Sequence, residues 1–450
     1  MSWSARRWLS WAEPVYATTV LLMLTLGPVY QLRVRFGGPL FGPDLIDDPV
    51  VQQVFTAAYA VALVLLVRRF DARTLRRSPL VALGLFCAVV ALSAVWSHDR
   101  TRTLSQAVLL AGTSVFGTYL GSRFAPRVQA RMLCAALQIG SLVALLAVTR
   151  RWVGARDRNG AWTGIYFNRN SLGPVAALAL LSTIWLFFDF LGALNATQRA
   201  PYGRTRFLSW SVAMVVLVAV DLSLLAGAGS LTPLLGLAAA GGAVGLATVL
   251  GLLVRRGSVD DRRATALFRW LAILPLVAVL VGWRRFALAI GRSPTLESRT
   301  NVWTLVLETW KQRPLFGQGW MAMWTDSAFQ ERVTRVANSP LPNAHNGYLE
   351  VLLGIGLVGG IVFVVFLAGL VRHVWRIDRV VADRRATWVV AVTAYAFVVN
   401  LMETFVGANL LVWVLLVAAG ASSVTGGWKG PASPSPVSLS PERAAAAPTN

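Results

Sequence analysis

Residues 343–371 read NAHNGYLEVLLGIGLVGGIVFVVFLAGLV, and they show how the whole chain is built. A short polar run that contains a histidine passes directly into an apolar stretch, 347–371, long enough to cross a bilayer core of about 30 Å. Apolar stretches of about 17–25 residues recur from end to end, and we count about twelve. They predict an all-α integral membrane protein, because lipid admits helices that satisfy their own backbone hydrogen bonds. The expected spans are 14–32, 50–67, 79–96, 104–121, 132–149, 171–190, 207–224, 232–254, 268–283, 347–371, 386–406 and 408–425.

Composition supports a membrane protein and argues against a nucleic-acid-binding one. The chain is 56% hydrophobic and 14% charged, whereas a soluble domain is about 25% charged. We attribute the net charge of +22 to arginines that meet anionic lipid, and expect no nucleic-acid partner. The two cysteines, Cys87 and Cys134, lie in different expected spans and are interpreted as packing residues.

Lysine and arginine predict the orientation in the membrane. Placing both termini in the cytoplasm gives each short inner connector at least three basic residues. The chain then divides into a cytoplasmic N-terminus 1–13, a polytopic domain 14–425 and a Pro/Ser/Ala-rich tail 426–450 expected to be disordered. The outer basic residues gather in 150–170 and in 284–346, which carries eight of the 42. Because the positive-inside rule disfavours such loops, we interpret them as sites for an anionic ligand.

The large loop 284–346 is expected on the extracytoplasmic side and contains one predicted helix. Residues 300–312, TNVWTLVLETWKQ, place apolar side chains at helical spacing, which predicts an amphipathic helix on the bundle or in the interface. Pro314 is expected to end it, and Gly317 and Gly319 to form a turn. Arg299 falls just before its first turn, where free backbone N–H groups favour phosphate.

The loop resembles the signature region of the O-antigen ligase and polymerase superfamily. The resemblance rests on 291–320, GRSPTLESRTNVWTLVLETWKQRPLFGQGW, and 343–360, NAHNGYLEVLLGIGLVGG. Two upstream pieces also fit, LSAVWSHD at 92–99 and GIYFNRNSLG at 164–173, so that the likeness covers 80–420 in span order.

The resemblance implies an enzyme and its substrates. Members are membrane glycosyltransferases, of the GT-C type, that take an undecaprenyl-diphosphate-linked glycan as donor. They transfer it to a hydroxyl of a glycan or glycolipid acceptor at the outer face of the bacterial cytoplasmic membrane. We expect inversion, no cofactor and no metal, since three scattered histidines and few outer carboxylates form no ligand set. Ligase and polymerase share donor, topology and motifs, so both remain open.

His345 is the candidate catalytic base, because imidazole accepts a proton near neutral pH. The alternative is a structural histidine at the junction of loop and helix. Arginines expected to bind the diphosphate charge are Arg299, Arg292, Arg169 and Arg158, with solvated or snorkelling arginines as the alternative. Several residues are expected to support this site. Asn346 either orients His345 or caps the next helix, and Glu350 is expected beside His345. Asp221, Asn400 and Glu403 are expected to pair with site arginines, and Trp303 and Trp320 either stack on sugars or pack the loop.

One position departs from the family pattern. Many relatives have Ser-Arg at the outer start of the eighth span, where this chain reads GAGSLTP at 227–233, with Leu231 in place of the arginine. Arg169 is the candidate substitute, which favours the exopolysaccharide-polymerase-like branch.

Two other classes of protein would need different sequence features. A lipid-linked oligosaccharide flippase would need charges along a central path, whereas the arginines here gather in connectors. A peptidoglycan-type glycosyltransferase would need an outer-loop carboxylate, for which Asp326 and Glu331 are the candidates.

Overall fold

The structure is a computed structural model that describes residues 3–37, 48–68, 78–197, 204–271, 295–407 and 409–425. Regular structure within these ranges is helical, apart from an isolated bridge between Arg156 and Trp162. The helices are α1 Trp3–Met23, α2 Gly27–Arg35, α4 Pro49–Val67, α6 Ser78–Leu92, η1 Ser93–Val95, α7 Arg100–Arg123, α8 Pro126–Thr149, α9 Arg169–Thr197, α10 Arg204–Ala228, α11 Leu231–Arg255, α13 Thr295–Trp310, η2 Ala322–Thr325, α14 Ser327–Ala337, α15 Gly347–Val374, α16 Ile377–Ala382, α17 Ala386–Val399 and α18 Leu411–Thr425.

The helical membrane architecture expected from the sequence is confirmed in outline. Among the described residues, six helices are long and apolar enough to cross a membrane, or seven if one bent pair is a single span. The six are α4, α8, α9, α10, α11 and the helix that begins at Gly347. Twelve spans and an extracytoplasmic position for the loop remain predictions. Most of the expected span 268–283, the start of the loop and the tail 426–450 lie outside the described residues.

Several helices end earlier than the apolar pattern suggests. The first expected span breaks after Met23, and α1 and α2 meet at 71°. The expected span 386–406 is helical only to Val399. The Asn400 side chain accepts the Phe405 N–H at 2.9 Å and closes a turn. The remaining apolar residues of that span therefore form a loop at one end of the bundle.

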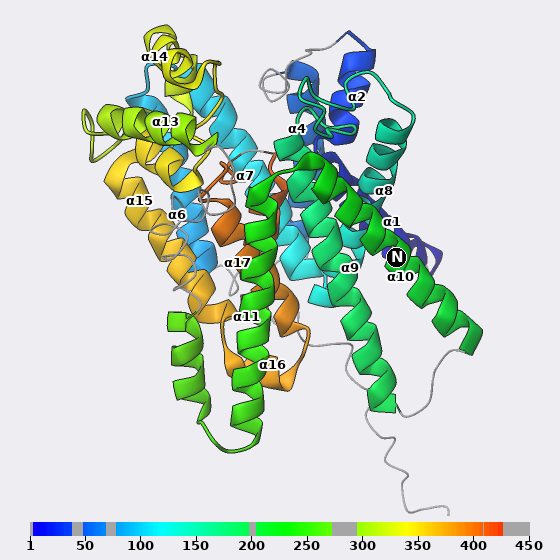
Figure 1. The fold of residues 1–450 in the computed structure, drawn as a ribbon. Helices are drawn as coiled ribbons and strands as arrows, with labels where there is room; N and C mark the ends of the chain where they lie inside the picture. The colour runs from blue at the N-terminus through cyan, green and yellow to red at the C-terminus, as the bar shows by residue number, and fades with distance from the viewer. Residues whose placement is uncertain are drawn as a thin grey trace, which may run out of the picture.

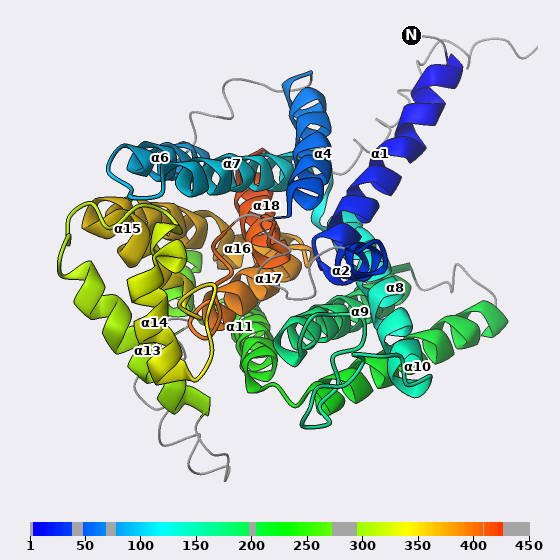
Figure 2. The ribbon, with the colours of Figure 1, turned by 90° about the horizontal axis from the view of Figure 1, so that it is seen from above.

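The bundle has a central pair of helices with helices on both sides. Figure 2 shows α17 and α18 at the centre, α13, α14 and α15 on one side, and α2, α8 and α9 on the other. Close contact between α18 and α7 rests on small residues: a Cβ at Gly117 or Gly121 would collide with the backbone of α18. In Figure 1, α13 and α14 lie at one end of the bundle and α16 at the other.

The helix expected over 300–312 is present as α13, and it begins earlier, at Thr295. Val302 and Val306 are buried in a small apolar cluster that Phe329 and Val333 of α14 complete. The two helices therefore form a cap with its own core. The expected turn follows α13, with positive φ angles of 70° at Gly317 and 100° at Gly319.

The turn after α13 inserts its backbone into a break in α15. Gly356 has φ 63° and ψ −161°, a conformation essentially confined to glycine. The break exposes carbonyl groups that accept hydrogen bonds from the turn, Gln318 N–H to Leu353 O at 2.8 Å and Gly319 N–H to Gly354 O at 2.9 Å. The N–H groups beyond the break are satisfied in return, Leu357 by Pro314 O at 2.9 Å and Val358 by Leu315 O at 3.0 Å. Four exchanged bonds thus join the cap to the membrane helix.

Replacing Gly356 by alanine should weaken this joint. The glycine conformation alone costs about 1–3 kcal/mol for another residue, and the new Cβ would collide with the Leu315 carbonyl. We expect the unfolding midpoint in detergent to fall by several degrees. The control is Gly245→Ala in α11, where a Cβ meets nothing within 4 Å and helix propensity favours alanine by about 1 kcal/mol. Equal midpoints for the two variants would contradict this account of the break.

Candidate functional site

A cavity of about 920 Å³ lies at the end of the bundle that the cap covers. One part of its wall is apolar and comes from the α1–α2 corner, α9 and α18, with Leu24, Leu26, Val175, Leu178, Leu411 and Val412. The other part is polar and comes from connecting segments and helix starts, with Thr25, Arg102, Asn168, Asn170, Ser171, Thr325, Gln330, Ser339, Asn343, His345, Glu403 and Thr404. The cavity therefore suits an amphiphilic ligand.

His345 and Glu403 meet in the cavity wall. The Nδ1 atom of His345 lies 2.6 Å from Glu403 Oε2. The other carboxylate oxygen accepts from Arg299 Nη2 at 2.7 Å, and Arg299 Nη1 donates to the Met402 carbonyl. A carboxylate that faces Nδ1 holds the proton on that nitrogen and leaves Nε2 with a lone pair. The three side chains thus form a line from an arginine through a carboxylate to an imidazole.

The backbone around His345 is fastened to the turn after α17. His345 has φ 48°, an uncommon conformation for a residue other than glycine, and the Asn343 side chain accepts its N–H at 3.0 Å. Asn346 N–H donates to Thr404 Oγ1 at 3.2 Å, and Gly347 N–H donates to Asn400 O at 2.9 Å. These bonds fix the distance between the segments that carry the histidine and the carboxylate.

Asn346 is the cap of α15. Its side chain accepts the N–H groups of Tyr348 at 3.0 Å and Leu349 at 3.1 Å, the geometry of an N-cap. Of the two roles expected for Asn346, the structure shows capping.

Glu350 is hydrogen-bonded to the loop and also interacts electrostatically with His345. Its carboxylate is 1% exposed and accepts Trp324 Nε1–H at 2.6 Å and Ala344 N–H at 2.9 Å. The Ala344 carbonyl in turn accepts from Trp303 Nε1 at 2.9 Å, so Trp303 packs against the histidine loop. The carboxylate that contacts the His345 ring is Glu403.

The neighbours of Glu403 favour the ionised form of its carboxyl group. Burial raises the pKa of its carboxyl, but the charges of His345 and Arg299 and their hydrogen bonds outweigh burial and hold the pKa below its ordinary value of 4.5. Glu403 was expected to pair with an arginine of the site, and its ion pair with Arg299 agrees with that expectation.

Arg102 brings a positive charge to the cavity and was not among the expected arginines. It lies in the first turn of α7, where the Asp99 side chain accepts its N–H at 2.9 Å and caps the helix. Its charge also acts on the Glu350 carboxylate. The sequence does indicate the start of this helix, because a capping residue follows Trp96. A capping motif does not predict, however, which residues of the first turn face the cavity.

The expected arginines lie in different places. Arg299 is tied to Glu403 and does not line the cavity. Arg169 is the half-buried first residue of α9, and its neighbours Asn168 and Asn170 line the cavity. Arg158 is exposed in the segment between α8 and α9, and Arg292 lies outside the described residues. Binding of a diphosphate by any of these four stays a prediction.

Leu231, the position where this chain departs from the family pattern, lies in a segment beside the start of α9. Ser230 Oγ lies 3.5 Å from Asn170 Oδ1, and a Cβ at Gly173 would contact Pro233 and Ser230. The start of α11 therefore packs against the segment that contains Arg169.

Asp221 lies away from the cavity, in a contact between α8 and α10. It is fully buried in α10 and accepts from Gln138 Nε2 of α8 at 2.6 Å. It does not line the cavity, and its partner is an amide rather than an arginine. Over the described ranges, no group of three or more His, Cys, Asp or Glu side chains could hold a metal ion.

Comparison with known families supports the sequence motifs. Residues 213–364, about a third of the chain, match the family model described as O-antigen ligase. This stretch contains Arg299, Trp303, His345 and Glu350. No curated protein matches the chain. The match supports the resemblance to the O-antigen ligase and polymerase superfamily over this part of the chain.

Glu403→Gln should change how stability depends on pH. A carboxyl whose folded-state pKa is lowered contributes stability above its ordinary pKa, and that contribution is lost as pH falls through the folded value. We expect a cost of about 3 kcal/mol at neutral pH, because Arg299 loses its counter-ion. Below about pH 4 the difference from wild type should narrow.

Unfolding midpoints between about pH 3 and 7 test this dependence. Glu331→Gln is the control, since its ion pair with Arg335 is exposed and contributes about 0–1 kcal/mol. Parallel profiles for wild type and Glu403→Gln would show that the Glu403 charge contributes nothing to stability.

Proposed function

We propose that the protein is a membrane glycosyltransferase that transfers a glycan from polyprenyl diphosphate, undecaprenyl diphosphate in a bacterium, to a sugar hydroxyl without a metal. The observation that carries the proposal is that His345 and Glu403, the latter held by Arg299, meet in the wall of a cavity that is apolar on one side and polar on the other. The family match supports the reaction class.

The cavity offers places for the parts of the donor. The apolar wall from the α1–α2 corner, α9 and α18 suits the polyprenyl chain, and the amide side chains of Asn168, Asn170 and Asn343 suit sugar hydroxyls. Arg102 lies in the polar part of the wall with these amides and offers a cation to the diphosphate. Its charge is most useful where the leaving oxygen becomes negative, as the bond between that oxygen and the anomeric carbon breaks.

His345 acts as the general base in this proposal. Nδ1–H donates to Glu403, and Nε2 takes the proton of the acceptor hydroxyl as its oxygen attacks the anomeric carbon. The electron pair of the glycosidic bond leaves with the diphosphate, and attack from the opposite side inverts the anomeric centre. The Glu403 carboxylate stabilises the imidazolium that forms, and Arg299 holds Glu403 in place.

The orientation supports chemistry outside the cytoplasm. The cavity and the cap lie at one end of the bundle, whereas α16 and the arginine-rich connector beside it lie at the other. By the positive-inside rule we assign the α16 end, together with both termini, to the cytoplasm of a bacterial inner membrane. The donor and acceptor then meet at the outer face, where surface polysaccharide is assembled.

A reconstituted assay tests the reaction. Purified protein is mixed in EDTA with a polyprenyl-diphosphate oligosaccharide pool from the source cells, and products are read by gel and mass spectrometry. A ladder of repeat multiples indicates a polymerase, and a single mass shift on an added acceptor indicates a ligase. Movement of labelled donor between leaflets without any product would replace the enzyme by a flippase.

His345→Ala should lower the rate about 10²–10⁴-fold, because the reaction loses its general base. His373→Ala is the matched control, since His373 lies in the last turn of α15 at the other end of the bundle, with Nδ1 2.8 Å from Gly369 O. Activity that survives in His345→Ala with a normal unfolding midpoint would remove His345 from the mechanism.

Arg102→Gln should lower the rate about 10²-fold, the usual effect of removing one charged group that faces a leaving oxygen. Lysine at this position should restore part of the rate, because it keeps the charge but not the forked geometry. Arg100→Gln is the control: Arg100 is exposed on the same turn of α7 and does not line the cavity. Equal losses in both variants would point to general electrostatics rather than to a contact.

A further inference from the structure

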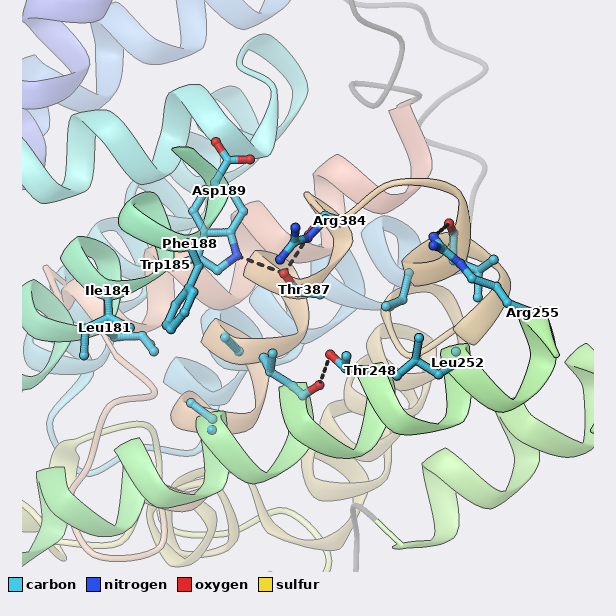
Figure 3. A pocket seen from close by; sticks show the side chains of 17 residues that line it. Leu181, Ile184, Trp185, Phe188, Asp189, Thr248, Leu252, Arg255, Arg384 and Thr387 are labelled. Carbon is cyan, nitrogen blue, oxygen red and sulfur yellow. Dashed lines mark hydrogen bonds between the residues drawn. The ribbon is translucent and has the colours of Figure 1, made fainter. Parts of the chain in front are cut away.

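A second pocket lies at the opposite end of the bundle from the candidate site. Figure 3 shows this groove, of about 460 Å³, between α9, α11 and the segment that joins α16 to α17. Helix α9 borders both spaces. Residues of its first part, between Asn170 and Leu178, line the cavity described above, and residues of its later part, between Leu181 and Asp189, line the groove. No residue is shared by the two linings.

The groove is open because α11 carries small residues along one side. Ala240 and Gly241 form its floor, and a Cβ at Gly241 would meet nothing within 4 Å. The facing wall is apolar and well exposed, with Ile184 39% and Phe188 57% accessible. The space is thus long, apolar and unfilled by the described side chains, which suits a hydrocarbon chain.

Charge is confined to one end of the groove. Arg255 and Arg384 lie there, and the acidic lining residue, Asp189, is paired with Arg127 at 2.5 Å. Arg255 donates to the Val381 carbonyl at 2.6 Å, which satisfies one of its N–H groups. The Arg384 guanidinium makes no hydrogen bond or ion pair with any described residue. It lies against α9, where a Cβ at Gly192 would collide with Nη1.

Neighbouring arginines differ from Arg384 in having protein partners. Arg385 lies 3.7 Å from Asp383, and Arg376 lies 2.6 Å from Asp378. The groove therefore combines an apolar channel with a polar end where the guanidinium of Arg384 has no hydrogen-bond partner among the described residues. Basic pockets between helices on the cytoplasmic side are where anionic lipid headgroups bind.

We propose that this groove binds one anionic phospholipid of the leaflet opposite the candidate site. One acyl chain lies between α9 and α11 along Ile184 and Gly241, and the phosphate contacts Arg384 and Arg255. The proposal does not depend on the glycosyltransferase reaction, because no lining residue is shared with the cavity.

The test is native mass spectrometry of the full chain released from nanodiscs that contain equal amounts of phosphatidylglycerol and phosphatidylcholine. Wild type should retain phosphatidylglycerol in preference. Arg384→Gln should lower that retention about fivefold, since one phosphate contact is lost. Gly241→Leu should lower it as well, because the side chain fills the channel while Arg384 keeps its charge.

Two matched controls accompany these variants. Arg385→Gln removes a charge one residue away that does not line the groove, and Gly242→Leu adds the same bulk to the same helix at a position outside the lining. Both should retain phosphatidylglycerol like wild type, and neither should lower the unfolding midpoint.

Three results would overturn the proposal. Equal retention of the two lipids by wild type would mean ordinary annular lipid. Unchanged retention in both Arg384→Gln and Gly241→Leu would place the lipid elsewhere. Release of phosphatidylglycerol by inorganic phosphate alone would assign the arginines to a free anion rather than to a lipid.

Discussion

The rest of the site depends on how α15 meets its backbone hydrogen-bonding requirement. A helix broken at membrane depth leaves carbonyl and N–H groups that lipid cannot satisfy. Here the segment 314–319 supplies partners for four of them, two as donor and two as acceptor. The cap is thereby held at one end by the break in α15, and at its other end by the bonds that fasten 343–347 to the turn after α17. His345 lies within this second attachment, so its position follows from both.

The fold could be predicted where one physical signal decides it. Apolar runs gave the helical membrane class, and the apolar spacing over 300–312 gave α13. Breaks within helices were harder to predict, because the apolar composition continues through them. Nothing in the run that contains Gly354 and Gly356 tells a broken helix from a flexible one, since the break is set by the turn that packs into it. The bend between α1 and α2 differs, because Gly27 and Pro28 mark it in the sequence: Pro28 lies in the first turn of α2, and Leu26 before it has φ 62°.

The site could be predicted in part. His345 follows from its place at the end of the loop and from the family motif, and a pairing of Glu403 with an arginine was expected. The pairing of Glu403 with His345 was not expected, because 58 residues and three helices separate them and no periodicity links such positions. Arg102 was missed for a similar reason. A capped first turn is visible in sequence, but the direction in which its third residue points depends on helix packing.

The histidine and its carboxylate belong to parts of the chain that are made at different times. Everything up to His345 is synthesised before α17, and Glu403 enters only with the turn that follows α17. A nascent chain in which the last two helices have not yet docked holds an imidazole with no carboxylate to orient it and an Arg299 with no counter-ion. The contacts among His345, Glu403 and Arg299 therefore form only when the bundle is complete.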